Sequence, residues 1–374
     1  MRAALLSCLA LLIPVTAAAQ SEPAPETLVF GGKTWRVTAQ EARVETFEGR
    51  ETLVLRGGRV WLDDASFSDG VIEFDARYEE VQGFIGPAWR ATSDNRFEEI
   101  YFRSHLNNMP DAVQYTPVEN GNSAWQIFSD GNAIASLSQT FEGWNHAKLV
   151  VIGDKADFYF NSDAPVLHVP DLKTDLKQGA IGLRATGPVT VRFSSVTHRP
   201  LTNQDRIAGE AKESPALPEG LIKSWTVSSV FSESKVENAL MLPASILNDL
   251  DWQELAVETN GIANISRLRE RLPDADGTVF VRLGISSDKA QMKELRFGYS
   301  DRVRIYLNGK RVYYGDAGWT VRDYRFLGTV GFFDSAGLDL KKGDNELLVA
   351  VSETFGGWAW AGAIEDQSGI TLQD

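Results

Sequence analysis

Chemically useful side chains alternate with apolar ones in the segment 98–105. Ile100 and Phe102 fall on one side of an extended chain there. Because successive side chains of a strand point to opposite faces, the residues between them form a row on the other face. That row combines a carboxylate, a phenol, a guanidinium and an imidazole: Glu99, Tyr101, Arg103 and His105. A set of this kind is typical of a ligand surface.

Neighbouring segments extend this polar row. Segments 83–91, 112–116 and 124–128 also have the composition of strands, and they contribute Arg90, Gln114 and Gln126. If these strands pair with segment 98–105, their polar faces merge into one patch. The alternative is that the polar groups pair with one another on a solvated sheet face. Acid–base work on a sugar by Glu99 with His105 or Arg103 is a further hypothesis.

Aromatic residues near the end of the chain form a second group of candidates. Sugar C–H faces pack on aromatic rings, and a neighbouring guanidinium or carboxylate can bond hydroxyl groups. The candidates for such a site are Trp319, Arg322, Tyr324, Trp358 and Trp360. The alternative is that some of these rings belong to the core of a β-sandwich, which uses aromatic residues freely.

Charge and composition exclude several classes of function. The chain of 374 residues carries a formal net charge of −14, so it repels phosphate backbones, and we expect no nucleic-acid partner. A neutral ligand such as a carbohydrate fits better. Its four histidines are scattered without metal spacing, so we predict no metal site and no cofactor. Calcium held by loop oxygens stays open, although no loop has the spacing of a dedicated site.

Export is indicated by the first nineteen residues. Arg2 precedes a largely apolar stretch that ends in Ala17, Ala18 and Ala19, which is the pattern of a secretory signal peptide. A loose lipobox ending at Cys8, the single cysteine, supports a lipoprotein as the alternative. No later run is long and apolar enough to span a bilayer. We therefore expect a secreted or periplasmic protein whose mature chain has no disulfide.

Short alternating runs separated by Gly, Asn and Asp turns predict an all-β chain. We expect two jelly-roll β-sandwich domains, at 28–198 and 221–374. The polar, proline-containing segment 199–220 is the predicted linker between them. In the second domain, Asn308-Gly309 is the strongest hairpin signal in the chain.

Residues 28–198 resemble the concanavalin A-like lectin/glucanase superfamily, particularly the laminin-G-like jelly rolls and the 3-keto-disaccharide hydrolase domain. The resemblance rests on the segments 70–75, 97–126, 144–146 and 182–183. Residues 221–374 resemble galactose-binding-domain-like jelly rolls, through the segments 304–310, 340–347 and 356–358. These resemblances imply fold more than activity, because the superfamily mixes lectins, glycosidases and adhesive modules.

Catalysis is less favoured by the sequence than binding. Glycoside hydrolysis needs two carboxylates at the scissile bond, which family 16 glucanases supply from one strand. Segment 73–79 starts that pattern, but Arg77 and Tyr78 stand where its last acid is required. The first hypothesis is therefore a carbohydrate-binding protein or accessory module. The alternatives are a hydrolase of a glycoside or sugar derivative, which requires an acid facing Arg103 or His105, and an adhesive surface protein with a flat face.

Overall fold

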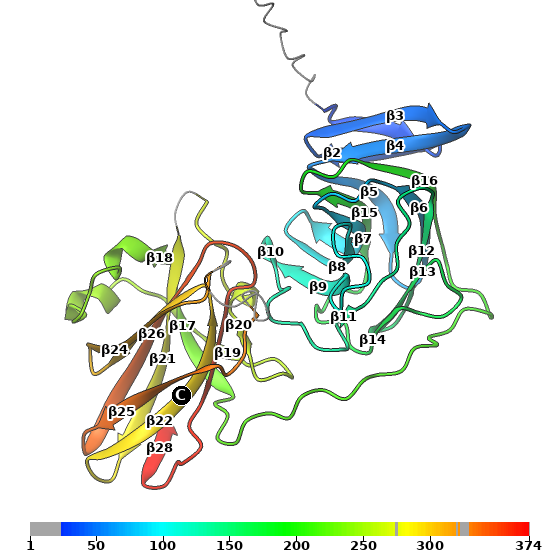
Figure 1. Cartoon of the computed structure of the whole chain (residues 1–374). Coiled ribbons are helices and arrows are strands. Elements are labelled where there is room, and N and C mark those ends of the chain that lie inside the picture. Colours follow the sequence, from blue (N-terminus) through cyan, green and yellow to red (C-terminus); the bar gives the residue numbers. More distant parts are fainter. Residues whose placement is uncertain (1–23, 274–275, 319–320, 322–328, 374) are drawn as a thin grey trace, which may run out of the picture.

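The computed structural model describes residues 24–273, 276–318, 321 and 329–373. Within these ranges the chain is almost entirely antiparallel β-structure, which confirms the predicted all-β class. Four sheets form two sandwiches that lie side by side (Figure 1). The predicted signal peptide, residues 1–19, lies outside the described residues.

The first sandwich is built from a nine-stranded and a seven-stranded sheet. The nine-stranded sheet contains, in spatial order, β1 (Thr27–Phe30), β2 (Lys33–Thr38), β5 (Gly58–Phe67), β15 (Gly179–Thr186), β7 (Phe84–Ser93), β8 (Arg96–Arg103), β9 (Val113–Glu119) and β10 (Asn122–Ser123), with β11 (Ile134–Ala135) also paired to β9. The seven-stranded sheet contains β14 (Leu167–Val169), β13 (Lys155–Phe160), β12 (Asn145–Ile152), β6 (Gly70–Arg77), β16 (Val191–Arg199), β4 (Arg50–Arg56) and β3 (Glu41–Phe47).

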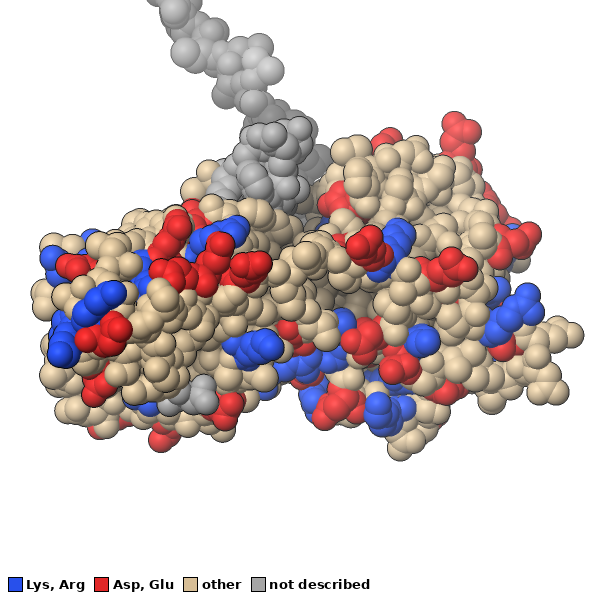
Figure 2. Space-filling model, turned by 90° about the horizontal axis from the view of Figure 1, so that it is seen from below, with Lys and Arg blue, Asp and Glu red and all other residues tan. Residues whose placement is uncertain are grey.

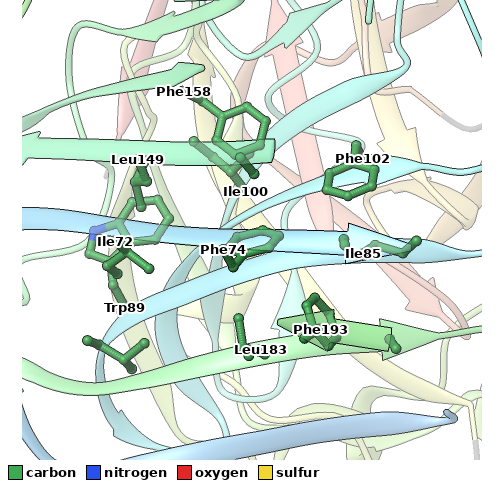
Figure 3. Packing of buried hydrophobic residues seen from close by; sticks show 14 of the residues in the cluster. Ile72, Phe74, Ile85, Trp89, Ile100, Phe102, Leu149, Phe158, Leu183 and Phe193 are labelled. Atoms are coloured by element: carbon green, nitrogen blue, oxygen red, sulfur yellow. The ribbon is translucent and has the colours of Figure 1, made fainter. Parts of the chain in front are cut away.

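The core of the first sandwich lies between these two sheets. Alternation places Ile72 and Phe74 of β6 against Ile100 and Phe102 of β8, and all four side chains are buried (Figure 3). Since the inner face of β8 is occupied by the core, Glu99, Tyr101 and Arg103 must point out of the other side of the nine-stranded sheet. This is the alternation that the sequence predicts.

The second sandwich is built from an eight-stranded and a four-stranded sheet. The larger sheet contains β19 (Trp252–Ala256), β17 (Ser224–Ser228), β21 (Gly277–Ser287), β26 (Gly343–Glu353), β23 (Arg302–Leu307) and β24 (Lys310–Asp316), with β18 (Phe231–Ser232) and β28 (Ile370–Gln373) also paired to β21. The smaller sheet contains β20 (Ala263–Asn264), β27 (Ala359–Ala363), β22 (Gln291–Ser300) and β25 (Asp334–Leu340). Three short 3₁₀ helices are η1 (Glu233–Lys235), η2 (Ala244–Leu247) and η3 (Ile265–Arg267).

The two sandwiches contact each other through a small apolar cluster. Ala124, Ile127 and Phe128 from the first sandwich pack with Ile262 and Ala359, among others, from the second. Hydrogen bonds cross the same junction: Asn120 donates to the Ser266 carbonyl at 2.8 Å, and Asn260 donates to the Ile127 carbonyl at 2.8 Å. The shared apolar cluster and the bonds around it fix the relative position of the sandwiches.

Residues 200–223, the green segment between β16 and β17 in Figure 1, contain no helix or strand. The segment is nevertheless attached to the first sandwich. The backbone N–H groups of Ala208 and Gly209 donate to the buried carboxylate of Asp157 at 2.6 and 3.0 Å. His168 contacts the other oxygen of Asp157 at 2.7 Å. Polar composition therefore marks an irregular segment here, but one with fixed contacts.

Candidate functional site

Seven residues on the outer side of the nine-stranded sheet form the surface that we call the arginine face. They come from five strands, β5, β15, β7, β8 and β9, and they include three residues of the predicted polar row. The members are Arg59, Phe84, Glu99, Tyr101, Arg103, Gln114 and Arg184. The register opposes Glu99 to Thr116 and Tyr101 to Gln114, so side chains of β8 and β9 lie beside each other.

Glu99 is the centre of the arginine face and is completely buried. Arg59 Nη2 lies 2.7 Å from one carboxylate oxygen, and Arg184 Nη1 lies 2.5 Å from the other. Burial by itself would raise the pKa of Glu99, but the charges and hydrogen bonds of Arg184 and Arg59 outweigh it and hold the pKa below its ordinary value. Glu99 is therefore a carboxylate at neutral pH and has no proton to donate.

Tyr101 and Arg103 share Gln114 as a partner. The Tyr101 hydroxyl donates to Gln114 Oε1 at 3.0 Å, and Arg103 Nη2 donates to the same oxygen at 2.6 Å. Gln114 donates in turn to the carbonyls of Trp125 and Phe128, both at 2.7 Å. Burial raises the pKa of Tyr101, so its phenol stays protonated. These bonds fix the orientation of all three side chains.

The rings of the arginine face lie beside its guanidinium groups. Arg184 lies 4.7 Å from the ring centre of Tyr101 and 5.3 Å from that of Phe84. His105 sits at the end of the face, where its ring is 5.8 Å from Phe84 and its Nδ1 accepts a bond from the Gly83 N–H at 3.3 Å. Burial, with the charge of Arg103, lowers the pKa of His105, so its ring is neutral at neutral pH.

Donor groups remain available on the arginine face. Each of Arg59 and Arg184 is anchored to Glu99, yet no acceptor among the described residues bonds Nη1 of Arg59 or Nη2 of Arg184. Three guanidinium groups stand here, with Glu99 between two of them and the Asp111 carboxylate 3.7 Å from Arg103. The surface therefore offers oriented N–H donors for oxygen-rich ligands, with aromatic rings beside them.

A second concave feature, the inter-sandwich cleft, lies between the two sandwiches and has a volume of about 680 Å³. Its first wall comes from turns of the nine-stranded sheet, and its second wall comes from the segment before β21 and the end of β26. The lining residues are Asn95, Asn120, Gly121, Asn122, Glu270, Arg271, Leu272, Pro273, Asp276, Glu353 and Thr354. None of them was singled out by the sequence, because the cleft forms only when distant segments meet.

Arg90 does not join the arginine face. The register of β15 against β7 shifts beside it, and Arg90 has a φ of 52°, so it is the extra residue of a β-bulge. The bulge interrupts the alternation on which the prediction depended. The Arg90 side chain is buried and bonds the carbonyls of Ser68 and Gly153 and the carboxylate of Asp69 instead.

Gln126 lies at the junction of the sandwiches. The predicted strand at 124–128 is wrong, because Ile127 N–H and Phe128 N–H both donate to the Ala124 carbonyl and close a turn. That turn directs Gln126 toward the second sandwich, where its side-chain oxygen accepts a bond from the Gly357 N–H at 2.6 Å. Gln126 therefore holds the two sandwiches together.

The aromatic candidates of the second sandwich do not form a ligand surface among the described residues. Trp358 and Trp360 are fully buried, and Trp360 packs on Trp225 and Phe297 in the core. Both rings belong to the core of the second sandwich, as the alternative interpretation of the sequence predicted. The remaining candidates, Trp319, Arg322 and Tyr324, lie outside the described residues.

No three His, Cys, Asp or Glu side chains of the described residues gather in a way that would hold a metal ion. No described helix is both long and apolar enough to cross a membrane. Acidic and basic side chains are interspersed over both lobes in the view of Figure 2.

No family model matches this chain, and no curated protein matches it. Among solved structures, carbohydrate-binding module CBM66 from Bacillus subtilis is similar at 18% identity, with 44% of this chain and 94% of that chain covered and a TM-score of 0.35. A protein of unknown function with a galectin-like fold from Bacillus subtilis is 14% identical, with 44% and 88% covered and a TM-score of 0.34. A Bacillus licheniformis beta-glucanase is 12% identical, with 49% and 91% covered and a TM-score of 0.32. Likenesses of this size assign neither a family nor an activity.

Proposed function

We propose that this is an exported carbohydrate-binding protein that contacts its ligand through the arginine face. The observation that carries the proposal is the pair Arg59 and Arg184, which Glu99 holds in place while one terminal nitrogen of each keeps its donor capacity. Export rests on the signal-peptide pattern of residues 1–19. The two sandwiches would act as separate domains, 28–198 and 221–374, joined by residues 199–220.

Carbohydrate suits this chemistry better than other ligands of similar size. Sugar hydroxyl and carboxylate oxygens accept hydrogen bonds from guanidinium groups, and sugar C–H faces pack on rings such as Phe84, which is half-buried. Because the guanidinium groups are already anchored, little side-chain entropy is lost when they bind. The net charge of −14 disfavours long polyphosphate ligands.

Binding is favoured over hydrolysis at this surface. The usual glycosidase mechanism needs one protonated carboxyl group and a second carboxylate. Glu99 is the one carboxyl group of the arginine face, and its pKa is held below the ordinary value. Its ion pairs also occupy both of its oxygens. An adhesive protein with a flat face is disfavoured by the polar inter-sandwich cleft.

The first test is a glycan array that contains neutral and uronate-containing glycans, probed with the protein and with an Arg184→Met variant. We expect the variant to bind the same glycans about tenfold or more weakly, because a hydrogen bond from a charged donor contributes about 1.5–3 kcal/mol. Glu99 keeps Arg59 as its partner, so the variant should fold.

Arg43→Met is the matched control, because Arg43 is an exposed residue of β3 in the other sheet. Equal binding by both variants would move the ligand away from the arginine face. Absence of binding to every glycan would overturn the proposed function. Release of free sugar from a bound glycan would show that the protein is an enzyme.

A further inference from the structure

The inter-sandwich cleft has a fixed geometry, because its walls belong to two sandwiches that are held together beside it. Asn120, which lines the cleft, donates across the junction to the Ser266 carbonyl. Arg267 donates to the Lys173 carbonyl at 2.7 Å in the same region. A cavity of about 680 Å³ lies within the range of about 300–1,000 Å³ that is usual for small-molecule sites. The cleft is therefore large enough for an oligosaccharide and is already formed.

The chemistry of the lining is that of amides. Asn95 is exposed and Asn120 is half-buried, and an amide side chain can both donate and accept hydrogen bonds. Asn122 is buried, and its amide donates to the Asn120 carbonyl at 3.3 Å. Sugar hydroxyl groups also donate and accept, so amides match them in either direction. Leu272 and Pro273 add apolar surface on the opposite wall, against which C–H groups can pack.

The lining contains three acidic residues, Glu270, Asp276 and Glu353, and one basic residue, Arg271. Asp276 accepts a bond from Arg302 at 2.9 Å and another from the Thr354 hydroxyl at 3.2 Å, so its charge is compensated. Arg271 donates to the Thr354 carbonyl, and the neighbouring Glu270 is exposed. No surplus of positive charge would attract an anion. No cluster of three ligating groups among the described residues would hold a cation.

Two buried polar atoms near the junction of the sandwiches have no hydrogen-bond partner among the described residues. They are Glu119 Oε1, which forms an ion pair with Arg267 at 3.6 Å, and the Ser266 hydroxyl. Glu119 precedes Asn120 in the chain, and the backbone carbonyl of Ser266 accepts the hydrogen bond of Asn120. Buried polar atoms in folded proteins are normally bonded.

We propose that the inter-sandwich cleft is a second saccharide site, which binds a neutral oligosaccharide between the two sandwiches. The proposal rests on the proposed function only in that both sites take carbohydrate. It differs in the residues used and in the ligand class, because the arginine face carries excess guanidinium groups and the cleft does not. Neither sandwich supplies the cleft alone.

The test isolates the cleft by using the full chain with Arg184→Met, which weakens the arginine face. Titration calorimetry with cellotetraose, maltotetraose, xylotetraose and laminaritetraose should find one that binds this variant with a stoichiometry of one. Adding Asn95→Trp should reduce its affinity at least tenfold, because Asn95 is an exposed turn residue and the larger ring fills the cleft. Adding Asn95→Ala instead should cost about fivefold, the loss of one neutral hydrogen bond.

Asn203→Trp is the matched control, since Asn203 is an exposed asparagine in the irregular segment 200–223. Binding that Asn95→Trp leaves unchanged would overturn the cleft proposal. So would binding to the unmodified protein but not to Arg184→Met, which would leave a single site on the arginine face and support the proposed function. No binding of the four sugars to either protein would also overturn the cleft proposal, and the glycan array would then decide the proposed function separately.

Discussion

Replacing Glu99 by alanine is expected to lower the free energy of unfolding by about 3 kcal/mol. Removing one partner of a buried ion pair usually costs about 3–5 kcal/mol, because the remaining charge is left without compensation. The low end of this range applies here, because the side chains of Arg59 and Arg184 are 22% and 14% exposed and can still contact water. Without Glu99, the two guanidinium groups would also face each other on one sheet.

Denaturant unfolding followed by tryptophan fluorescence measures this loss. Asp63→Ala is the control, because it removes one partner of Arg36 in an exposed ion pair whose side chains are 37% and 53% exposed. Such pairs contribute about 0–1 kcal/mol. Equal losses in the two variants would mean that Glu99 does not anchor the arginines. A triple replacement of Glu99, Arg59 and Arg184 by methionine should recover much of the stability, since apolar residues can replace a buried ionic triad.

The local pattern of β8 was sufficient to predict which of its side chains share a face. Ile100 and Phe102 enter the core, and Glu99, Tyr101 and Arg103 leave it, because the strand is regular over its whole length. The Asn308-Gly309 hairpin was predictable for the same reason. Both residues have positive φ, 51° and 80°, and they connect β23 directly to β24.

The partners of Glu99 could not be found from local pattern. Arg59 and Arg184 stand 40 and 85 positions away in the chain, and the sheet order β5, β15, β7, β8 brings them to Glu99. Their own strands do show alternation, but nothing in them specifies which strand lies beside which. The inter-sandwich cleft has the same origin, since it requires the packing of two sandwiches.

Three other errors arose, two where the regular alternation of a strand is interrupted or absent and one where burial decides the role of a residue. A β-bulge at Arg90 breaks the period of two, and a turn at 124–128 replaces a strand of suitable composition. Trp358 and Trp360 are of the residue type that stacks on sugar rings, but both are packed in the core of the second sandwich. Composition alone does not separate a buried ring from an exposed one.

Glu353 is expected to make the stability of this protein fall as pH rises from about 4.5 to about 8. It ends β26, is buried to 1% exposure, and accepts a bond from the Ser300 hydroxyl at 2.8 Å. Burial, with the neighbouring charge of Asp301, raises its pKa from the ordinary value of 4.5 to about 8. The folded state therefore keeps a proton that the unfolded chain loses. Stability from this group is fully present below pH 4.5 and is lost on the way to pH 8.

The expected slope from this one proton is on the order of 1.4 kcal/mol for each pH unit. Glu353→Gln should remove that slope while keeping a similar side-chain volume. The free energy of unfolding of the variant should therefore rise relative to that of the unmodified protein as pH increases from 5 to 8. Glu270→Gln is the control, because it removes an exposed carboxylate from the same cleft. Denaturant midpoints at four pH values give the comparison. Parallel pH profiles for the unmodified protein and Glu353→Gln would mean that Glu353 is ionised in the folded state, and that Asp301 and Glu353 then hold two charges side by side.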